Sequence, residues 1–239
     1  MAAYGSPIIR PGLANIDGTI TRSDLLGYGA HKLGFDAAHS GVCEAFHAIQ
    51  QQGYRPVYVS ARPITKAGKT RELLALVGHK ESGLAMPAGP LITTSERTLS
   101  ALVRSLRRKG GGADEFKVGV LLDIAAAFVL EGGGPSPRVF YAGFGNRDTD
   151  AQAYNAAGVP KNRIFIIDER SRLSVRETRQ LFESYSELVE LVPQFFPPIA
   201  TVRAREEAEI KAAQSANGHE QGSEMTETEK GVEPGLESM

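Results

Sequence analysis

Short apolar runs alternate with amphipathic stretches along most of the chain, and the two kinds of run have different periods. Three runs have the length and the β-branched or aromatic content of buried strands: residues 55–60, 138–145 and 163–168. Four stretches carry apolar residues at helical spacing: residues 39–52, 95–109, 148–157 and 179–191. This alternation predicts an α/β fold with a doubly wound, mainly parallel sheet.

A first strand is expected to end at Asn15-Ile16-Asp17, but the residues before it suit a strand poorly. Pro11 and Gly12 lie where a central strand needs backbone donors and side chains that pack. We therefore expect either a very short strand or an N-terminus around which the domain was not built. The predicted domains are an irregular or misassembled N-terminus at 1–13, an α/β domain at 14–200, and a short helical extension with an acidic tail at 201–239.

The C-terminal segment differs in charge from the rest of the chain. Residues 203–239 hold nine acids, four bases and no aromatic residue, whereas residues 1–202 hold 19 acids and 23 bases. Such a segment cannot bury enough apolar surface to offset its ordering entropy, so we expect disorder over about 212–239. The acidic tail is either merely solvated or screens the basic body.

Composition narrows the class of protein. The 239 residues are 41% hydrophobic and 23% charged with a net charge of -1, which is typical of a folded globular protein. The single cysteine, Cys43, excludes an internal disulfide framework and a cysteine-ligated zinc site. The sequence contains no secretory signal, no apolar run that could span a bilayer and no stacking motif for nucleic acid. We expect a soluble intracellular protein that does not bind nucleic acid.

Two polar residues at the end of the first expected strand are the first sign of chemistry. Side chains alternate along a strand, so Asn15 and Asp17 point to the same side, beyond the carboxyl end of the strand. That edge of an open α/β sheet is where ligands bind. The following Gly18 and Thr19 fit this interpretation, but Asp-Gly-Thr also occurs in ordinary turns.

Polar residues at other strand ends favour a ligand site. Ser60, Ala61 and Arg62 follow one apolar run, and Asn146 and Asp150 follow another. Lys117 lies between these two segments. The set offers oxygen ligands for a hard divalent cation, with a cation and hydrogen-bond donors for phosphate oxygens.

The order of acid pair, serine, lysine and acid resembles the haloacid-dehalogenase phosphotransferase superfamily, and the motifs resemble the lipin-type phosphatidate phosphatases within it. The resemblance runs from about residue 15 to 197 and implies a Rossmann-like domain. The motifs that carry it are Asp17-Gly18-Thr19-Ile20-Thr21, Ser60-Ala61-Arg62, Gly145-Asn146-Arg147 with Asp150, and Phe196-Pro197.

The resemblance implies a Mg²⁺-dependent hydrolysis of phosphatidic acid to diacylglycerol at an anionic membrane surface. The nucleophile position is occupied by Asn15, and Asp17 would protonate the leaving alcohol and then activate water. Further implied roles are phosphoryl binding by Thr19, Ser60 and Lys117, substrate contact by Gly18, Ala61 and Arg62, and metal binding by Asn15, Asp17, Asn146 and Asp150. The implied location is cytoplasmic, peripheral at the endoplasmic reticulum, or nuclear.

Asn15 departs from the family pattern, which has an aspartate there. A carboxamide is a poor nucleophile and removes a negative charge from the cation site, so turnover should fall by about 10⁴-fold or more. An engineered trapping mutant, a truncated or mis-joined gene product, and a natural pseudoenzyme each account for Asn15. The sequence therefore predicts an impaired phosphatidate phosphatase-like domain, with an inactive phosphatidic-acid sensor or interaction module as the alternative. Its oligomeric state is not indicated.

Overall fold

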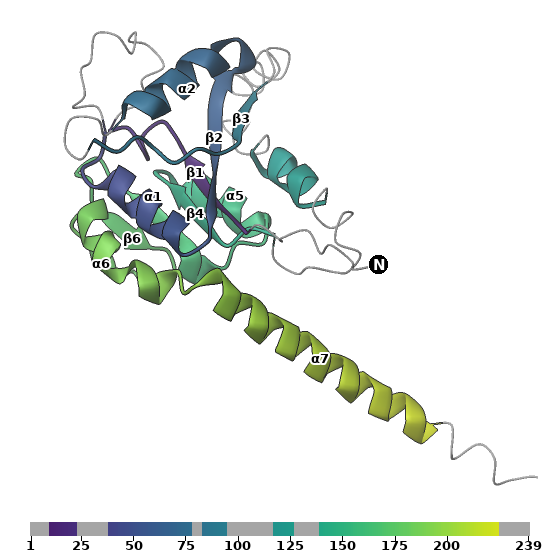
Figure 1. Ribbon diagram of the computed structural model, residues 1–239. Coiled ribbons are helices and arrows are strands. Elements are labelled where there is room, and N and C mark those ends of the chain that lie inside the picture. The colour runs from purple at the N-terminus through teal and green to yellow at the C-terminus, as the bar shows by residue number, and fades with distance from the viewer. Residues whose placement is uncertain (1–9, 23–37, 78–82, 95–116, 127–138, 225–239) are drawn as a thin grey trace, which may run out of the picture. The chain divides into compact units, whose positions relative to one another are not determined.

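A single sheet organises the domain. The computed structural model describes residues 10–22, 38–77, 83–94, 117–126 and 139–224. Within these residues, seven strands form one sheet in the order β3-β2-β1-β4-β5-β6-β7 (Figure 1). The strands are β1 (Pro11–Asn15), β2 (Arg55–Pro63), β3 (Leu91–Thr94), β4 (Ala142–Gly145), β5 (Ile164–Ile167), β6 (Leu173–Val175) and β7 (Leu181–Phe182). Strands β1 to β5 pair in parallel, and β6 and β7 pair antiparallel, which confirms the predicted α/β class.

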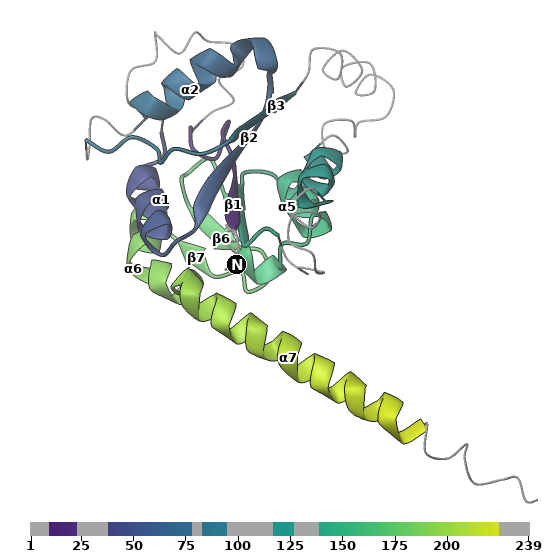
Figure 2. The ribbon, with the colours of Figure 1, turned by 45° about the vertical axis from the view of Figure 1, so that its right-hand side comes forward.

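Helices cover both faces of the sheet. The described helices of this unit are α1 (Val42–Gln51), α2 (Ala67–Leu76), α5 (Asp148–Ala156) and α6 (Tyr185–Phe195), with short helical turns η2 (Ile64–Lys66) and η3 (Lys161–Arg163). Residues 117–126 are also helical. Figures 1 and 2 show α1 and α6 on one face, and α5 with residues 117–126 on the other. This is the doubly wound arrangement that the alternating pattern predicted.

The two faces are built by the alternation of side chains along the central strands. On β4, Phe144 points to the α1 and α6 side, where its ring lies 5.1 Å from that of Phe46 and 6.2 Å from that of Tyr185. On the opposite side, Leu13 of β1 belongs to a buried cluster with Leu121 and residues of α5. Because Asn15 lies two residues after Leu13, its side chain is directed to the α5 side of the sheet.

Strand β1 is central, despite its unusual composition. It begins at Pro11, pairs with β2 and β4, and is buried at all five positions. Proline is tolerated as the first residue of a strand, and the Pro11 carbonyl still accepts the backbone N–H of Tyr141 at 3.0 Å. Regular structure therefore starts before the predicted boundary at residue 14, so the expectation of an irregular 1–13 is wrong for 11–13. Residues 1–9 lie outside the described residues.

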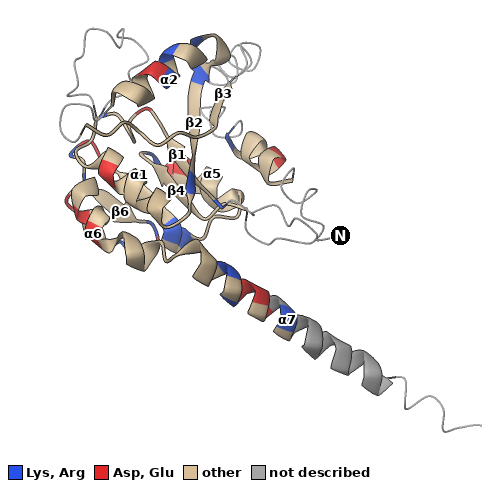
Figure 3. Ribbon diagram, in the orientation of Figure 1, with Lys and Arg blue, Asp and Glu red and all other residues tan. Residues whose placement is uncertain are grey.

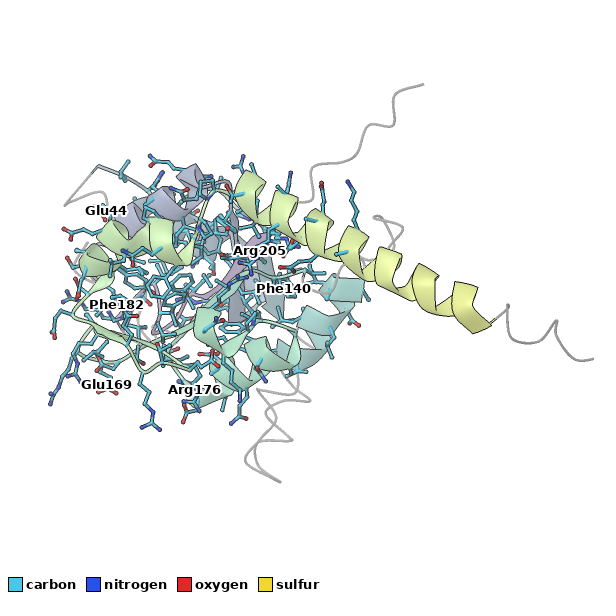
Figure 4. The ribbon with its side chains drawn as sticks, turned by 90° about the horizontal axis from the view of Figure 1, so that it is seen from below. Glu44, Phe140, Glu169, Arg176, Phe182 and Arg205 are labelled. Atoms are coloured by element: carbon cyan, nitrogen blue, oxygen red, sulfur yellow. The ribbon has the colours of Figure 1, made fainter. Side chains whose placement is uncertain are left out.

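The C-terminal end of the predicted domain differs most from expectation. Residues 179–191 were expected to be one helix, but Leu181–Phe182 form β7, and α6 begins only at Tyr185. Leu181 pairs with Ser174 in an antiparallel ladder, and Arg179 has a left-handed φ of 55° that a helix excludes. In Figure 4 the Arg176 side chain points outward from this region, whereas Phe182 is directed inward and is 0% exposed.

The remaining predicted helices have mixed outcomes. Helices were expected at 39–52 and 148–157, and α1 and α5 lie there. Cys43 of α1 is buried. The stretch 95–109 lies outside the described residues.

Helix α7 belongs to a second compact unit of the chain. It runs from Ile199 to Glu224, whereas disorder was expected from about residue 212. The first part of the helix is rich in Ala, Glu, Lys, Arg and Gln, which favour a helix without any buried core. Low apolar content was therefore a poor reason to predict disorder there. Among the described residues, no helix is both long enough and apolar enough to cross a membrane.

Candidate functional site

The predicted site residues lie at the point where the order of the strands reverses. From β1 the chain proceeds to β2 and β3 on one side, whereas β4 and β5 lie on the other. In open α/β sheets, ligands bind at the carboxyl ends of the strands where the strand order reverses, which here are the ends of β1 and β4. Asn15 is the last residue of β1, and Asn146 directly follows β4.

A tight loop follows β1 and fixes the backbone of the first motif. The Ile16 carbonyl accepts the backbone N–H groups of Thr19, Ile20 and Thr21 at 3.0 to 3.3 Å. Gly18 has a φ of 79°, and a Cβ at this position would overlap the side chain of Asn146. A glycine is therefore required both by the left-handed backbone and by the close approach of Asn146.

Two side-chain amides meet at the centre of the site. The Asn15 Nδ2 donates to the Asp17 backbone oxygen at 3.0 Å and to Asn146 Oδ1 at 3.0 Å. The Thr19 hydroxyl also donates to Asn146 Oδ1, at 3.3 Å. If the Asn146 amide is turned over, its nitrogen instead donates to the Asp17 backbone oxygen at 3.1 Å and to Asp150 Oδ2 at 3.3 Å. The orientation of an amide is inferred from its partners, and here the partners conflict.

The carboxylate of Asp17 faces residues at the end of β2. Arg62 donates to both of its oxygens, from Nε at 3.1 Å and from Nη2 at 2.5 Å. Ser60 Oγ lies 3.5 Å from Asp17 Oδ2 and accepts the backbone N–H of Arg62 at 3.1 Å. All three residues are buried. Arg62 therefore orients and balances the acid that the family resemblance assigns to proton transfer.

A second ion pair lies beside the amides. Lys117 Nζ is paired with Asp150 Oδ1, and the side chain of Asp150 is 0% exposed. The other oxygen of Asp150 accepts the backbone N–H groups of Asn146 at 3.0 Å and Arg147 at 3.2 Å. Since Asp150 belongs to the first turn of α5, its negative charge also suits the helix dipole. The two backbone hydrogen bonds to Asp150 fix the turn that carries Asn146, and Lys117 balances the charge of Asp150.

The oxygen atoms at the centre of the site suit a divalent cation. Asp17 offers its backbone oxygen, Asn146 its amide oxygen and Asp150 a carboxylate oxygen, with neighbouring atoms 3.1 and 3.3 Å apart. Oxygens bound to one Mg²⁺ at about 2.1 Å lie at similar separations in octahedral geometry. The described residues contain no group of three His, Cys, Asp or Glu side chains that could hold a metal, so backbone and amide oxygens must supply most ligands.

While the Asn15 nitrogen points to Asn146, neither orientation of the Asn146 amide satisfies every contact at this centre. With Asn146 Oδ1 inward, that oxygen faces the Asp17 backbone oxygen and Asp150 Oδ2 with no hydrogen between them. With its nitrogen inward, Asn146 faces the Asn15 nitrogen at 3.0 Å. A cation removes this conflict, because both amides can then present oxygen to it. By this criterion the residues fit a cation, although Asn15 is neutral and adds no negative charge to the site.

Two further side chains hold the first loop, and the sequence did not single them out. His39 is buried, with Nε2 3.4 Å from the Gly18 carbonyl and Nδ1 2.8 Å from Ser171 Oγ. Tyr185 donates from its hydroxyl to the Thr19 carbonyl at 3.2 Å. No local sequence pattern marks either residue, because both act through contacts with distant segments of the chain. Burial lowers the pKa of His39, and its contact with Gly18 offsets part of that shift.

The structure brings the predicted site residues into one network from four segments of the chain. Contacts join Asn15, Asp17, Thr19, Ser60, Arg62, Lys117, Asn146 and Asp150. Gly18 lies against Asn146, and Ala61 is a half-buried residue of β2 between Ser60 and Arg62. The catalytic, substrate-binding and metal-binding roles of these residues stay predictions.

Comparisons with known proteins agree with the motifs. Residues 8–197 match the LNS2 (Lipin/Ned1/Smp2) domain. Phosphatidate phosphatase PAH1 of Arabidopsis thaliana is 38% identical over 190 residues, which cover 80% of this chain and 20% of that protein. Human phosphatidate phosphatase LPIN2 is 40% identical over 185 residues, covering 77% and 20%, and nuclear elongation and deformation protein 1 of Schizosaccharomyces pombe is 38% identical over 200 residues, covering 82% and 29%.

The match covers most of this chain but a small part of each relative. The chain spans between 20% and 29% of the length of these three proteins. The matched region contains the whole network around Asp17, Asn146 and Asp150. The resemblance to the lipin-type phosphatases is thereby confirmed at the level of the family: the chain belongs to the LNS2 (Lipin/Ned1/Smp2) family.

Proposed function

We propose that this domain binds the phosphate monoester of phosphatidic acid together with Mg²⁺ and hydrolyses it slowly, because Asn15 replaces the nucleophile. The observation that carries the proposal is the convergence of Asp17, Ser60, Lys117 and Asn146 at the strand-order reversal. Membership of a family whose relatives are named phosphatidate phosphatases supports the substrate class.

The proposed reaction breaks the bond between phosphorus and the glycerol oxygen. Asp17 gives its proton to the departing alcohol, water supplies the oxygen that ends on phosphorus, and a proton released by that water returns to Asp17, giving diacylglycerol and inorganic phosphate. Lys117 and the hydroxyls of Thr19 and Ser60 are placed to neutralise charge that grows on the phosphoryl oxygens. When one Asp17 oxygen carries the proton, the hydrogen bond from Arg62 to that oxygen must weaken.

Asn15 limits this chemistry at the attacking position. The nitrogen lone pair of an amide is delocalised into the carbonyl, so the side chain cannot replace a carboxylate as the attacking group. When bound, Mg²⁺ would neutralise phosphoryl charge, and the residues that would hold it are Asp17 through its backbone oxygen, Asn146, Asp150 and Asn15 through its amide oxygen. Slow turnover then depends on water alone as the nucleophile.

An exposed basic and apolar element beside the site supports a lipid substrate. Directly after Arg62, the turn η2 presents Ile64 at 61% exposure, and Lys66 and Lys69 next to it are exposed. Figure 3 shows basic residues at this end of α2. An exposed apolar residue followed by two lysines suits the surface of an anionic bilayer, where each lysine contributes about 1 kcal/mol. We propose that this element faces the membrane that supplies the phosphatidic acid.

The proposed location follows from the substrate. Phosphatidic acid is a membrane lipid, so the domain would act peripherally, at the endoplasmic reticulum or the nuclear membrane. The name of the S. pombe relative, nuclear elongation and deformation protein 1, supports the second site. Fractionation of cells that express the tagged chain tests this proposal.

The proposed function is tested by phosphate release from phosphatidic acid vesicles with Mg²⁺. We expect slow release by the wild type and an increase on the order of 10⁴-fold in Asn15→Asp. Asp17→Asn in the Asn15→Asp background should still bind the vesicles but lose the gain. If neither the wild type nor Asn15→Asp binds or cleaves phosphatidic acid while both are folded, the proposed function is wrong.

A phosphatidic-acid sensor that does not hydrolyse its ligand is the second candidate. The observation in its favour is that the Asn15 amide donates to Asp17 O and Asn146 Oδ1, so residue 15 takes part in the network without acting as a nucleophile. A sensor would bind phosphatidic acid vesicles with no phosphate release above that of Asp17→Asn. Measurable release by the wild type that Asp17→Asn abolishes would exclude it.

A further inference from the structure

We infer that Asn15 sets the order in which this site fills: the phosphate monoester binds first, and the divalent cation binds only once the phosphate is present. This inference rests on the proposed function and adds how the two ligands depend on each other. It follows from three properties of the site: its balanced charge, the conflict between the two amides, and the donor that remains when that conflict is resolved.

The charged side chains of the site leave no excess negative charge for a cation. Asp17 is paired with Arg62, and Asp150 is paired with Lys117. Asn15 and Asn146 are neutral. A divalent cation that enters alone must lose part of its hydration shell in exchange for neutral oxygens and one carboxylate that a lysine already balances. Mg²⁺ gives up water reluctantly, so its affinity for the site alone should be low.

A phosphate monoester supplies the missing charge. It carries about -1.5 to -2 at neutral pH, and Thr19 and Ser60 offer it two hydroxyl donors, while Lys117, which also pairs with Asp150, can donate to both anions. A carboxylate at residue 15 would repel this anion, whereas the neutral Asn15 does not. The phosphate can therefore bind before the cation in this chain, and it then attracts the cation to the oxygens of Asp17, Asn146 and Asp150.

The Asn15 amide can serve both ligands at once. In the absence of a cation its NH₂ group donates to Asp17 O and Asn146 Oδ1, the same oxygens that a cation would use. When the amide turns its oxygen to the cation, the NH₂ group needs a new acceptor. A phosphate oxygen is the acceptor that the proposed ligand brings. Each ligand thus stabilises the amide orientation that the other requires, and by linkage each raises the affinity for the other by the same factor.

The inference is tested by titrating Mg²⁺ into the folded chain by calorimetry, with and without a short-chain phosphonate analogue of phosphatidic acid. The analogue has a C–P bond that the proposed reaction cannot cleave, so turnover does not disturb the measurement. For the wild type we expect Mg²⁺ affinity to rise by roughly tenfold or more with the analogue, and analogue affinity to rise equally with Mg²⁺. The analogue alone should bind measurably.

Two variants show whether residue 15 is responsible. Asn15→Asp should bind Mg²⁺ in the absence of the analogue, at least about tenfold more tightly than the wild type, and should bind the analogue alone more weakly. Leu181→Asp adds the same charge at a half-exposed position on β7, the strand at the edge of the sheet, and should behave like the wild type. Circular dichroism and urea unfolding confirm that each variant is folded.

The possible failures are distinguishable. If the wild type binds Mg²⁺ alone as tightly as Asn15→Asp does, or if the analogue leaves the Mg²⁺ affinity of the wild type unchanged, the inferred order is wrong while the proposed function stands. If the analogue binds neither the wild type nor Asn15→Asp, with or without Mg²⁺, the proposed function is wrong, and so is this inference, which rests on it.

Discussion

The two sides of the site differ in how well their polar groups are matched. On the side of β2 and α5, Asp17 is paired with Arg62 and Asp150 with Lys117, so each buried charge has its partner. At the ends of β1 and β4, Asn15 and Asn146 face each other with contacts that neither orientation of the Asn146 amide satisfies while the Asn15 nitrogen points to it. The first side consists of matched charges, whereas the second consists of neutral amides that can turn to suit a ligand. Asn15, the residue proposed to limit turnover, lies on the second side.

Loss of a charge on the matched side should have the largest effect on stability. Lys117→Met leaves the buried Asp150 carboxylate without its cation and should lower the free energy of unfolding by about 3 kcal/mol. Urea denaturation measures this change. The matched control is Arg176→Ala, which breaks the exposed Arg176–Asp148 pair and should cost less than about 1 kcal/mol. Equal losses in the two variants would show that the Asp150 pair is no better matched than a surface pair.

A side chain at Gly18 should disturb both sides, with a smaller loss of stability. Gly18→Ala introduces a Cβ at a φ of 79° and against Asn146, and should lower the free energy of unfolding by about 2 kcal/mol. It should also abolish binding of the phosphonate analogue. Gly12→Ala is the control, since a Cβ there meets nothing within 4 Å, and it should leave stability unchanged or raise it by up to about 1 kcal/mol. Normal ligand binding by Gly18→Ala would contradict the tight packing of the loop on Asn146.

A pH dependence through His39 is the smallest expected effect. Burial lowers the pKa of His39 below 6.5, while Arg22 lowers it further and the Gly18 contact and Asp168 oppose the shift. The unfolded chain then binds this proton more readily, so stability contributed by neutral His39 is present above pH 6.5 and is lost as pH falls towards the lowered pKa. His39→Gln should flatten that part of the profile of unfolding free energy against pH. An unchanged slope would show that other groups cause it.

Much of the site could be predicted because its residues follow strand ends. The alternation that places Asn15 and Asp17 on one side of β1, and the position of Ser60 near the end of β2, needed only the period of a strand and the topology of α/β sheets. Lys117 was harder, because it lies on a helix and reaches Asp150 across the fold. Its place came from the order of family motifs alone.

What the sequence did not reveal depends on contacts between distant segments. Strands β6 and β7 are three and two residues long, and tertiary contacts rather than a local pattern set the pairing of β6 with β5 and of β7 with β6. The role of His39 also depends on tertiary contacts, because its two partners, Gly18 and Ser171, lie in different segments of the chain. Helix α7 was misjudged for the opposite reason, since local helix propensity is enough for it to form.

The most direct test is a crystal structure of the wild type with Mg²⁺ and the phosphonate analogue. The account predicts Mg²⁺ at about 2.1 Å from the Asp17 backbone oxygen and Asn146 Oδ1, with the Asn15 oxygen turned towards it and a phosphonate oxygen on the same ion. The phosphonate should also contact Lys117 and Ser60. An analogue bound away from Ser60 and Lys117, or an Asn146 amide with its nitrogen towards Asp17 while the analogue is bound, would contradict it.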